Sequence, residues 1–291
     1  MQYPLISEYV KASQDASDNL DMSTEATDEE LNEAITDEFG VKYSKDGRKL
    51  LKAPQELNGT YPIRKGLYGT YSIKEGTKII CDMAFDSCRS LSRLVIPDSV
   101  TSIGDYAFNG CTSLTDIVIP DSVTSIGNRA FYGCTSLSSV VIPDGVTSIG
   151  EGAFLWCSSL SEIVIPSSVT SIGHSAFYKC DSLRVVISDG VTSIWDSAFG
   201  GCDSLSEIVI PSSVTSIGDH AFEGCRSLSE IVIPSSVTSI GDSAFEGCHS
   251  LSEIVIPSSV TSIGDKAFQF CNFPNDLKQE LISRFGEKIF G

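Results

Sequence analysis

The residues best suited to chemistry in this chain are its cysteines, ten in 291 residues. Nine recur at one position of a repeating pattern: Cys88, Cys111, Cys134, Cys157, Cys180, Cys202, Cys225, Cys248 and Cys271. Zinc needs ligands that converge from several directions. A disulfide needs Cβ atoms about 3.8 Å apart, whereas stacked coils hold parallel side chains about 4.8 Å apart. We therefore expect no metal and no disulfide, but buried free thiols that act as small apolar groups and suit a reducing compartment.

The remaining nucleophiles and bases lack a catalytic spacing. The sequence contains no phosphate-binding loop, no G-x-S-x-G and no H-E-x-x-H pattern. Serine and threonine recur as repeat positions without a partnering histidine, and the three histidines fall at inconsistent places, at His174, His220 and His249. The sequence therefore predicts a protein that is not an enzyme and that uses no cofactor.

A 23-residue repeat organises these residues. Its leading isoleucine recurs at Ile80, Ile103, Ile126, Ile149, Ile172, Ile194, Ile217, Ile240 and Ile263, and every step is 23 residues except the 22 from Ile172 to Ile194. A fixed period of this size is typical of a solenoid, in which each coil buries its apolar side against its neighbours. We expect one elongated domain.

The facing of side chains within one coil follows from residues 160–173. Strand alternation predicts that Ile163 points inward and Val164 outward, and Pro166 ends this strand because it cannot donate to a ladder. A second short strand ends at Ile172. The next stretch, usually Gly-Asp-x-Ala-Phe-x-Gly-Cys, is interpreted as a helical turn, with aspartate as its N-cap and the second glycine as its left-handed end. Phenylalanine recurs once per coil in this stretch, which predicts a core spine.

The pattern Leu-x-x-Ile-x-Ile-Pro-x-x-Val-x-x-Ile-Gly-x-x-Ala-Phe-x-Gly-Cys-x-x-Leu resembles the BspA-type leucine-rich repeat over residues 67–273. The resemblance implies an α/β repeat fold, a right-handed leucine-rich-repeat solenoid with parallel strands and short helical turns. It also implies a bacterial protein, since members of that family are often surface or secreted proteins and some bind host matrix or plasma proteins.

The two ends of the chain differ from the repeats, as an open solenoid requires caps. Asp46-Gly47 is a hairpin signal, and a ten-residue unit at 57–66 is echoed at 67–76, so that one copy is expected to bulge out as a loop. Thr27-Asp-Glu-Glu30 resembles a helix capping box. The predicted divisions are an acidic tail at 1–40, weakly helical or disordered; an N-terminal cap with a strand hairpin and a degenerate repeat at 41–78; the solenoid at 79–273; and a C-terminal capping helix at 274–291.

The net charge of −18 is unevenly distributed. Residues 1–40 carry about −10, residues 41–93 about +6 and residues 94–291 about −14. The short basic stretch is too small to give an acidic molecule the basic stripe that nucleic acid requires. No apolar run is long enough to span a membrane, and the first residues do not resemble a signal peptide. We expect a monomer, located in the cytoplasm if Met1 is the native start, and at the surface or secreted if a leader was removed.

Two surfaces are candidates for binding a protein partner. One is the strand face, where a valine column that includes Val164 lies beside a column that includes Glu162, Glu207, Glu230 and Glu253. An apolar stripe next to an acidic one suits a basic, extended partner, although valine is also simply a good strand residue and glutamate keeps such a face soluble.

The other candidate is an aromatic patch. Tyr132, Leu155 and Tyr178 occupy one outward position in successive coils, Trp156 and Lys179 replace the usual glycine, and Trp195 replaces another glycine in the short coil. Clustered exposed aromatics mark interaction sites, whereas drift after duplication, with local repacking, would produce the same residues without a site.

These observations favour a non-enzymatic protein-interaction scaffold, adhesin-like by the family resemblance. The alternative is a regulatory or sensory repeat appendage of a bacterial signalling system, because residues 4–9 and 15–20 faintly resemble the opening of bacterial kinase-like proteins that carry such repeats. No kinase motif follows those residues.

Overall fold

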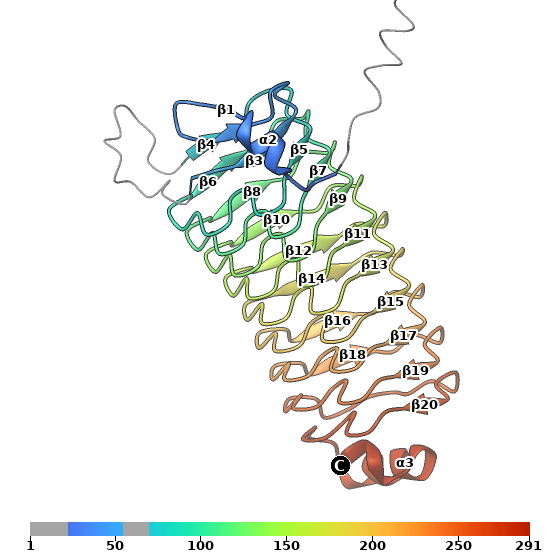
Figure 1. The fold of residues 1–291 in the computed structure, drawn as a ribbon. Coiled ribbons are helices and arrows are strands. Elements are labelled where there is room, and N and C mark those ends of the chain that lie inside the picture. Colours follow the sequence, from blue (N-terminus) through green and yellow to red (C-terminus); the bar gives the residue numbers. More distant parts are fainter. Residues whose placement is uncertain (1–22, 55–69) are drawn as a thin grey trace, which may run out of the picture.

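The structure is a computed structural model that describes residues 23–54 and 70–291 (Figure 1). It is an elongated stack of coils, and each typical coil contributes a longer and a shorter strand. The longer strands are β4 (Thr70–Ser72), β6 (Arg93–Val95), β8 (Asp116–Val118), β10 (Ser139–Val141), β12 (Glu162–Ile165), β14 (Arg184–Ile187), β16 (Glu207–Val209) and β18 (Glu230–Val232). The shorter strands are β5 (Ile79–Ile80), β7 (Ser102–Ile103), β9 (Ser125–Ile126), β11 (Ser148–Ile149), β13 (Ser171–Ile172), β15 (Ser193–Ile194), β17 (Ser216–Ile217), β19 (Ser239–Ile240) and β20 (Ser262–Ile263).

Strands of successive coils pair in parallel and in register. Ile149 pairs with Ile172, and Asp116 pairs with Ser139, each one repeat apart. The shorter strands continue without a break from β5 to β20, whereas the longer strands form a six-stranded sheet from β4 to β14 and a separate pair, β16 and β18. The interruption follows the 22-residue step, so the missing residue is accommodated on the longer-strand side. The predicted parallel-strand solenoid is confirmed.

The predicted helical turns are wrong. In the Ala-Phe-x-Gly-Cys stretch of the coil after β7, the amides of Phe108 and Gly110 donate to Ala130 and Tyr132 of the next coil, at 2.7 Å each. The intervening amide of Asn109 donates three residues back, to Tyr106. Tight turns therefore replace a helix, because the adjacent coil supplies the carbonyls that a helix would supply from its own chain. Helices of the described residues lie only at the ends of the solenoid, so the α/β description holds in part.

The aspartate of each turn is not an N-cap. Its carboxylate accepts the backbone amide at the same position of the next coil: Asp219 Oδ1 accepts from Asp242 N, and Asp242 Oδ1 accepts from Asp265 N, both at 2.7 Å. Asn128 performs the same function for Glu151 N at 2.9 Å. We call this column the aspartate ladder. Each rung of the ladder satisfies one backbone amide and ties two neighbouring coils together.

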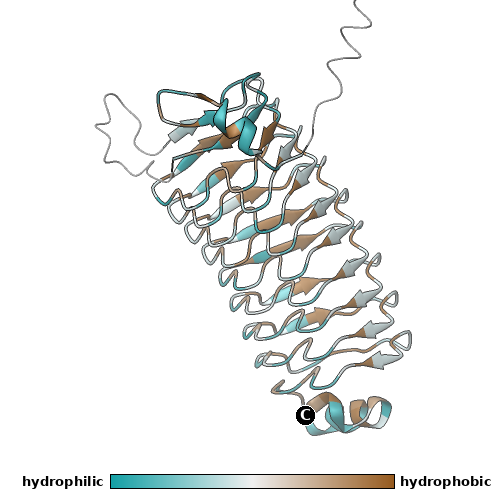
Figure 2. Ribbon diagram, in the orientation of Figure 1, coloured by the Kyte–Doolittle hydropathy of each residue, from teal (hydrophilic) through white to brown (hydrophobic). Residues whose placement is uncertain are grey.

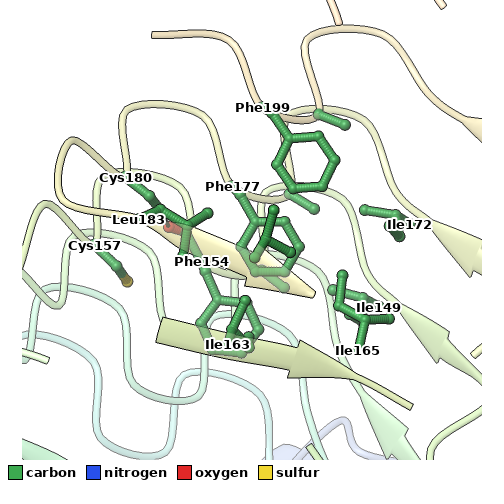
Figure 3. Close-up of a cluster of buried hydrophobic side chains, with 14 of the residues drawn as sticks. Ile149, Phe154, Cys157, Ile163, Ile165, Ile172, Phe177, Cys180, Leu183 and Phe199 are labelled. Atoms are coloured by element: carbon green, nitrogen blue, oxygen red, sulfur yellow. Dashed lines mark hydrogen bonds between the residues drawn. The ribbon is translucent and has the colours of Figure 1, made fainter. Parts of the chain in front are cut away.

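The predicted phenylalanine spine is confirmed (Figure 3). The Phe154, Phe177 and Phe199 rings are fully buried and stacked, with centroids 5.4 and 5.5 Å apart and interplanar angles of 1° and 4°. Inward-facing Ile163 and Ile165 are buried beside them, as the alternation predicted. Figure 2 shows the apolar residues concentrated in the strands that enclose this core.

The cysteine column is buried, as predicted, and all ten thiols are free in the structure. The thiol of each repeat cysteine from Cys111 onward donates to a phenylalanine carbonyl of the preceding coil at 3.1–3.2 Å, as Cys225 does to Phe199 O. Burial raises the pKa of Cys225 and of Cys271 to about 12. The thiols are therefore protonated and weak nucleophiles in the folded protein.

We expect Ellman's reagent to titrate almost no thiol in the native protein at mildly alkaline pH, and all ten in concentrated guanidinium chloride. Both the high pKa values and the lack of access predict this result. Stopped-flow absorbance measures it. Rapid reaction of several thiols under native conditions would contradict the packing described above.

The N-terminal end carries α2 (Asp28–Asn32) and the antiparallel strands β1 (Ile35–Thr36), β2 (Lys42–Tyr43) and β3 (Lys49–Lys52). Both capping-box hydrogen bonds between Thr27 and Glu30 are present. The strand β3 then pairs in parallel with β5 and so joins the solenoid. Of the duplicated ten-residue units, residues 57–66 lie outside the described residues, as do residues 1–22, so the predicted bulging loop is not described.

The C-terminal end carries α3 (Asn275–Phe285), which ends at Gly286, and the 3-10 helix η1 (Glu287–Phe290). The amides of Lys266 and Phe268 donate to Lys288 and Ile289. These carbonyls take the place of those that a further coil would supply.

Candidate functional site

The longer-strand face presents a continuous column of exposed valines. Its members are Val95, Val118, Val141, Val164, Val186, Val209, Val232 and Val255, and their exposed fractions range from 49% to 81%. Strand register places them in line across the sheets, as with Val209 opposite Val232. So long an apolar stripe on an exposed face is a feature of interaction surfaces.

The polar column beside the valines differs from the prediction in one residue. The 22-residue step brings Arg184 opposite Glu162 in the strand register. Arg184 therefore stands in the column between Glu162 and Glu207, and the acidic stripe is not continuous. Glu207, Glu230 and Glu253 remain as a run of three exposed acids, and no ion pair of the described residues involves them. Arg184 could have been found from the sequence, because it precedes Val186 by two residues, as Glu162 precedes Val164.

The residues of the predicted aromatic patch lie at adjacent positions of successive coils, but their side chains do not form one exposed surface. The backbone hydrogen bonds from Gly133 N to Leu155 O and from Trp156 N to Tyr178 O place these positions side by side in successive coils. The side chains of Tyr132, Leu155 and Tyr178 are only partly exposed, however. The Tyr178 ring lies against Gly200 of the next coil, where an added Cβ would be 2.8 Å from its Cδ2. Much of the patch is thus engaged in packing between coils.

Trp156 is the exposed member of the patch, at 53%. Its φ of 66° is left-handed, like that of Gly133 at the same position, so a bulky side chain is held in a conformation that favours glycine. Lys179 occupies the same repeat position in the next coil, and Asp181 is two residues after Lys179 in the sequence. Burial raises the pKa of Asp181; Lys179 opposes this shift and Asp203 adds to it.

Trp195 does not belong to this patch. It follows β15 on the shorter-strand face, is 45% exposed, and its ring lies 5.1 Å from that of His174. The aspartate ladder is interrupted at this point: in the described residues it runs from Asp82 to Glu151 and resumes only at Asp196. His174 Nδ1 is 3.4 Å from Asp196 Oδ2.

Trp195 stands at one end of a groove on the shorter-strand face, and Lys288 stands at the other. The groove runs across β15, β17, β19 and β20 and has a volume of about 480 Å³. One side is the serine column from Ser193 to Ser262, the other side is the aspartate ladder, and the floor is the backbone at Gly218, Gly241 and Gly264. We call it the ladder groove. Sequence reasoning missed it because its floor consists of residues without side chains.

Other kinds of site are not visible in the residues that the structure covers. No cluster of three or more histidine, cysteine, aspartate or glutamate side chains could hold a metal ion in residues 23–54 and 70–291. Over the same residues, no helix has the length and apolar character needed to cross a bilayer.

Among solved structures, the chain is similar to a leucine-rich cell surface protein from Faecalibacterium prausnitzii, at 38% identity over 65% of this chain with a TM-score of 0.46. The chain spans 60% of that protein. It is also similar to a leucine-rich repeat protein of T. pallidum, at 34% identity over 65% of this chain and 81% of that one, with a TM-score of 0.49. A third structure, from Eubacterium ventriosum, shares 28% identity over 70% and 68% of the two chains, with a TM-score of 0.47.

A comparison with curated proteins finds no match. The sequence model of the BspA type leucine-rich repeat region, in contrast, matches residues 77–187 and 184–291, with six copies. These matches cover the solenoid and its C-terminal end. The coils, the in-register strands and the matched repeats together show that the chain belongs to the BspA-type leucine-rich repeat family.

Proposed function

We propose that the protein is a non-enzymatic scaffold that binds another protein along the longer-strand face, in the manner of an adhesin. The observation that carries this proposal is the exposed valine column beside three acids that have no partner in the described residues. The F. prausnitzii protein is described as a cell surface protein, which supports a role in contact with other proteins. The partner is a protein, and the scaffold acts as a monomer.

The docking segment within this face is the stretch after the sheet interruption. Val209, Val232 and Val255 are 58–81% exposed there, and they lie beside Glu207, Glu230 and Glu253. Apolar contact with the valines would supply binding energy, and the acids would select a partner with basic residues and steer its approach. The aromatic patch is the weaker candidate, because Tyr132, Leu155 and Tyr178 are partly used in packing.

The test is binding of the immobilised protein to a panel of matrix and plasma proteins, measured by biolayer interferometry. Reversing three charges, in Glu207→Lys, Glu230→Lys and Glu253→Lys together, should weaken binding by tenfold or more. Wild-type binding should also fall as salt rises, because ions screen exposed charges beyond about 10 Å at 0.1 M. The matched control is Glu162→Lys, in the same column but on the other side of Arg184, which should leave binding nearly unchanged.

Trp156→Ala separates the two surfaces. If Trp156→Ala abolished binding and the triple charge reversal left it intact, docking would lie on the aromatic patch and the strand-face proposal would be wrong. Circular dichroism melts of all variants check that the solenoid itself is unchanged.

A further inference from the structure

The face that holds the ladder groove is already occupied by the chain itself at its N-terminal end. There the backbone amide of Asp82, the first member of the aspartate ladder, donates to Thr24 O at 2.8 Å. Ala26, Leu31 and Ala34 pack against Leu51, Ile79 and Cys81, the outward residues of the first coils. A segment of polypeptide thus docks on this face by giving a main-chain carbonyl to the ladder and covering the outward side of the strands (Figure 1).

The C-terminal end of the same face is occupied by a cation. Lys288, which follows α3, places its Nζ 3.0 Å from Asp265 Oδ1. Asp265 is the last ladder position, and among the described residues no backbone amide donates to its carboxylate, so the basic side chain takes the place of the next amide at Oδ1.

The ladder groove lies between these two ends and offers the same two groups, a ladder amide and ladder carboxylates, without a docked segment among the described residues. Asp219 and Asp242 each use Oδ1 for the ladder, and in the described residues no ion pair engages either carboxylate. The amide of Asp196, next to Trp195, has no acceptor among the described residues, because the ladder is interrupted at His174. The exposed Trp195 ring adds a face on which a cation can lie.

We propose that the ladder groove binds an extended, basic peptide segment of a partner protein. Successive phenylalanine rings in these coils are 5.3–5.6 Å apart, so the groove is about 16 Å long, which corresponds to about five residues of extended chain. Lysine or arginine side chains lie against Asp219 and Asp242, as Lys288 lies against Asp265. A main-chain carbonyl accepts from the Asp196 amide, as Thr24 O does from Asp82.

This site is separate from the longer-strand face, so neither proposal depends on the other. The chain has two tryptophans, Trp156 and Trp195. In a Trp156→Phe background, Trp195 is the sole tryptophan and reports on the groove. The probe is a capped seven-residue peptide of alternating serine and arginine, and the control peptide replaces arginine with glutamate. We expect a saturable change in Trp195 emission, with one peptide per protein, that weakens as salt rises and is absent with the glutamate peptide.

The test variant is Asp219→Asn with Asp242→Asn in the same background. Asparagine keeps the ladder acceptor, as Asn128 shows, but removes the charge. Peptide binding should weaken tenfold or more while the melting temperature changes little. The matched control is Asp98→Asn with Asp121→Asn, which removes two charges at exposed corners outside the groove and should leave the dissociation constant unchanged.

Three results would overturn the inference. One is no saturable change in emission with the arginine peptide up to about 1 mM. Another is equal weakening by the two asparagine pairs, which would show attraction to net charge alone. The third is peptide binding that is lost on Glu230→Gln with Glu253→Gln but retained in Asp219→Asn with Asp242→Asn, which would place the peptide on the longer-strand face.

Discussion

Phe177→Ala is expected to lower the free energy of unfolding by about 3–5 kcal/mol, the range for truncating a buried aromatic ring. Phe177 is fully buried and stacks on Phe154 and Phe199, at 5.4 and 5.5 Å. The loss therefore weakens the interface on both sides of one coil. Because solenoid stability is approximately a chain of nearest-neighbour terms, the N-terminal and C-terminal halves should then melt separately.

Differential scanning calorimetry measures both effects. The wild type should show one main transition and Phe177→Ala two, the lower of which is shifted down. The control is Ser182→Ala, an exposed position in the same coil, which should change the melting temperature very little. A Phe177→Ala melt that matched this control would show that the ring is not part of the core spine.

Gly241→Val should destabilise the protein by about 3 kcal/mol, at the upper end of the range for overpacking. A Cβ at this glycine would lie 2.6 Å from Asp219 N and from the Gly218 carbonyl carbon of the preceding coil. Both are backbone atoms, which cannot move aside as a flexible side chain can. The coils would have to separate, and the rung between Asp219 and Asp242 would be strained.

Urea unfolding followed by circular dichroism gives the free energy for this variant. Ser239→Val is the matched control, because it adds similar bulk to the same strand at an outward position, and its cost should stay within about 0.5 kcal/mol. Equal stabilities of Gly241→Val and Ser239→Val would mean that the coils are not stacked as closely as described.

The facing of the core residues could be read from the sequence because stacking repeats a local rule. A 23-residue period with Ile163 inward and Val164 outward leaves one arrangement in which every coil covers the next. The same rule placed the phenylalanines and cysteines inside, and the valine column outside. A position filled alike in every coil faces the same neighbour in every coil, so its environment follows from the pattern.

The sequence did not predict the local structure at positions where the hydrogen bonds of one coil are made to the next coil rather than within the same coil. The turn at Phe108 was predicted to be helical because Ala-Phe-x-Gly-Cys has helix-ending signals, yet its amides find carbonyls in the adjacent coil. The ladder function of Asp219 was likewise hidden, because an N-cap and a ladder acceptor favour the same residue type. Local propensity is weak, and a neighbouring backbone at hydrogen-bonding distance overrides it.

The features of the candidate sites likewise fall into those that the repeat pattern predicted and those that only the structure showed. The sequence by itself determined the repeat, the buried columns and the exposed valine and glutamate columns, because these depend only on period and alternation. Only the tertiary structure decided that Tyr178 is packed against Gly200 and that Trp195 stands at the end of a groove. These facts depend on how the side chains and backbone of one coil lie against the next coil, and that is a property of stacking in space rather than of spacing along the chain.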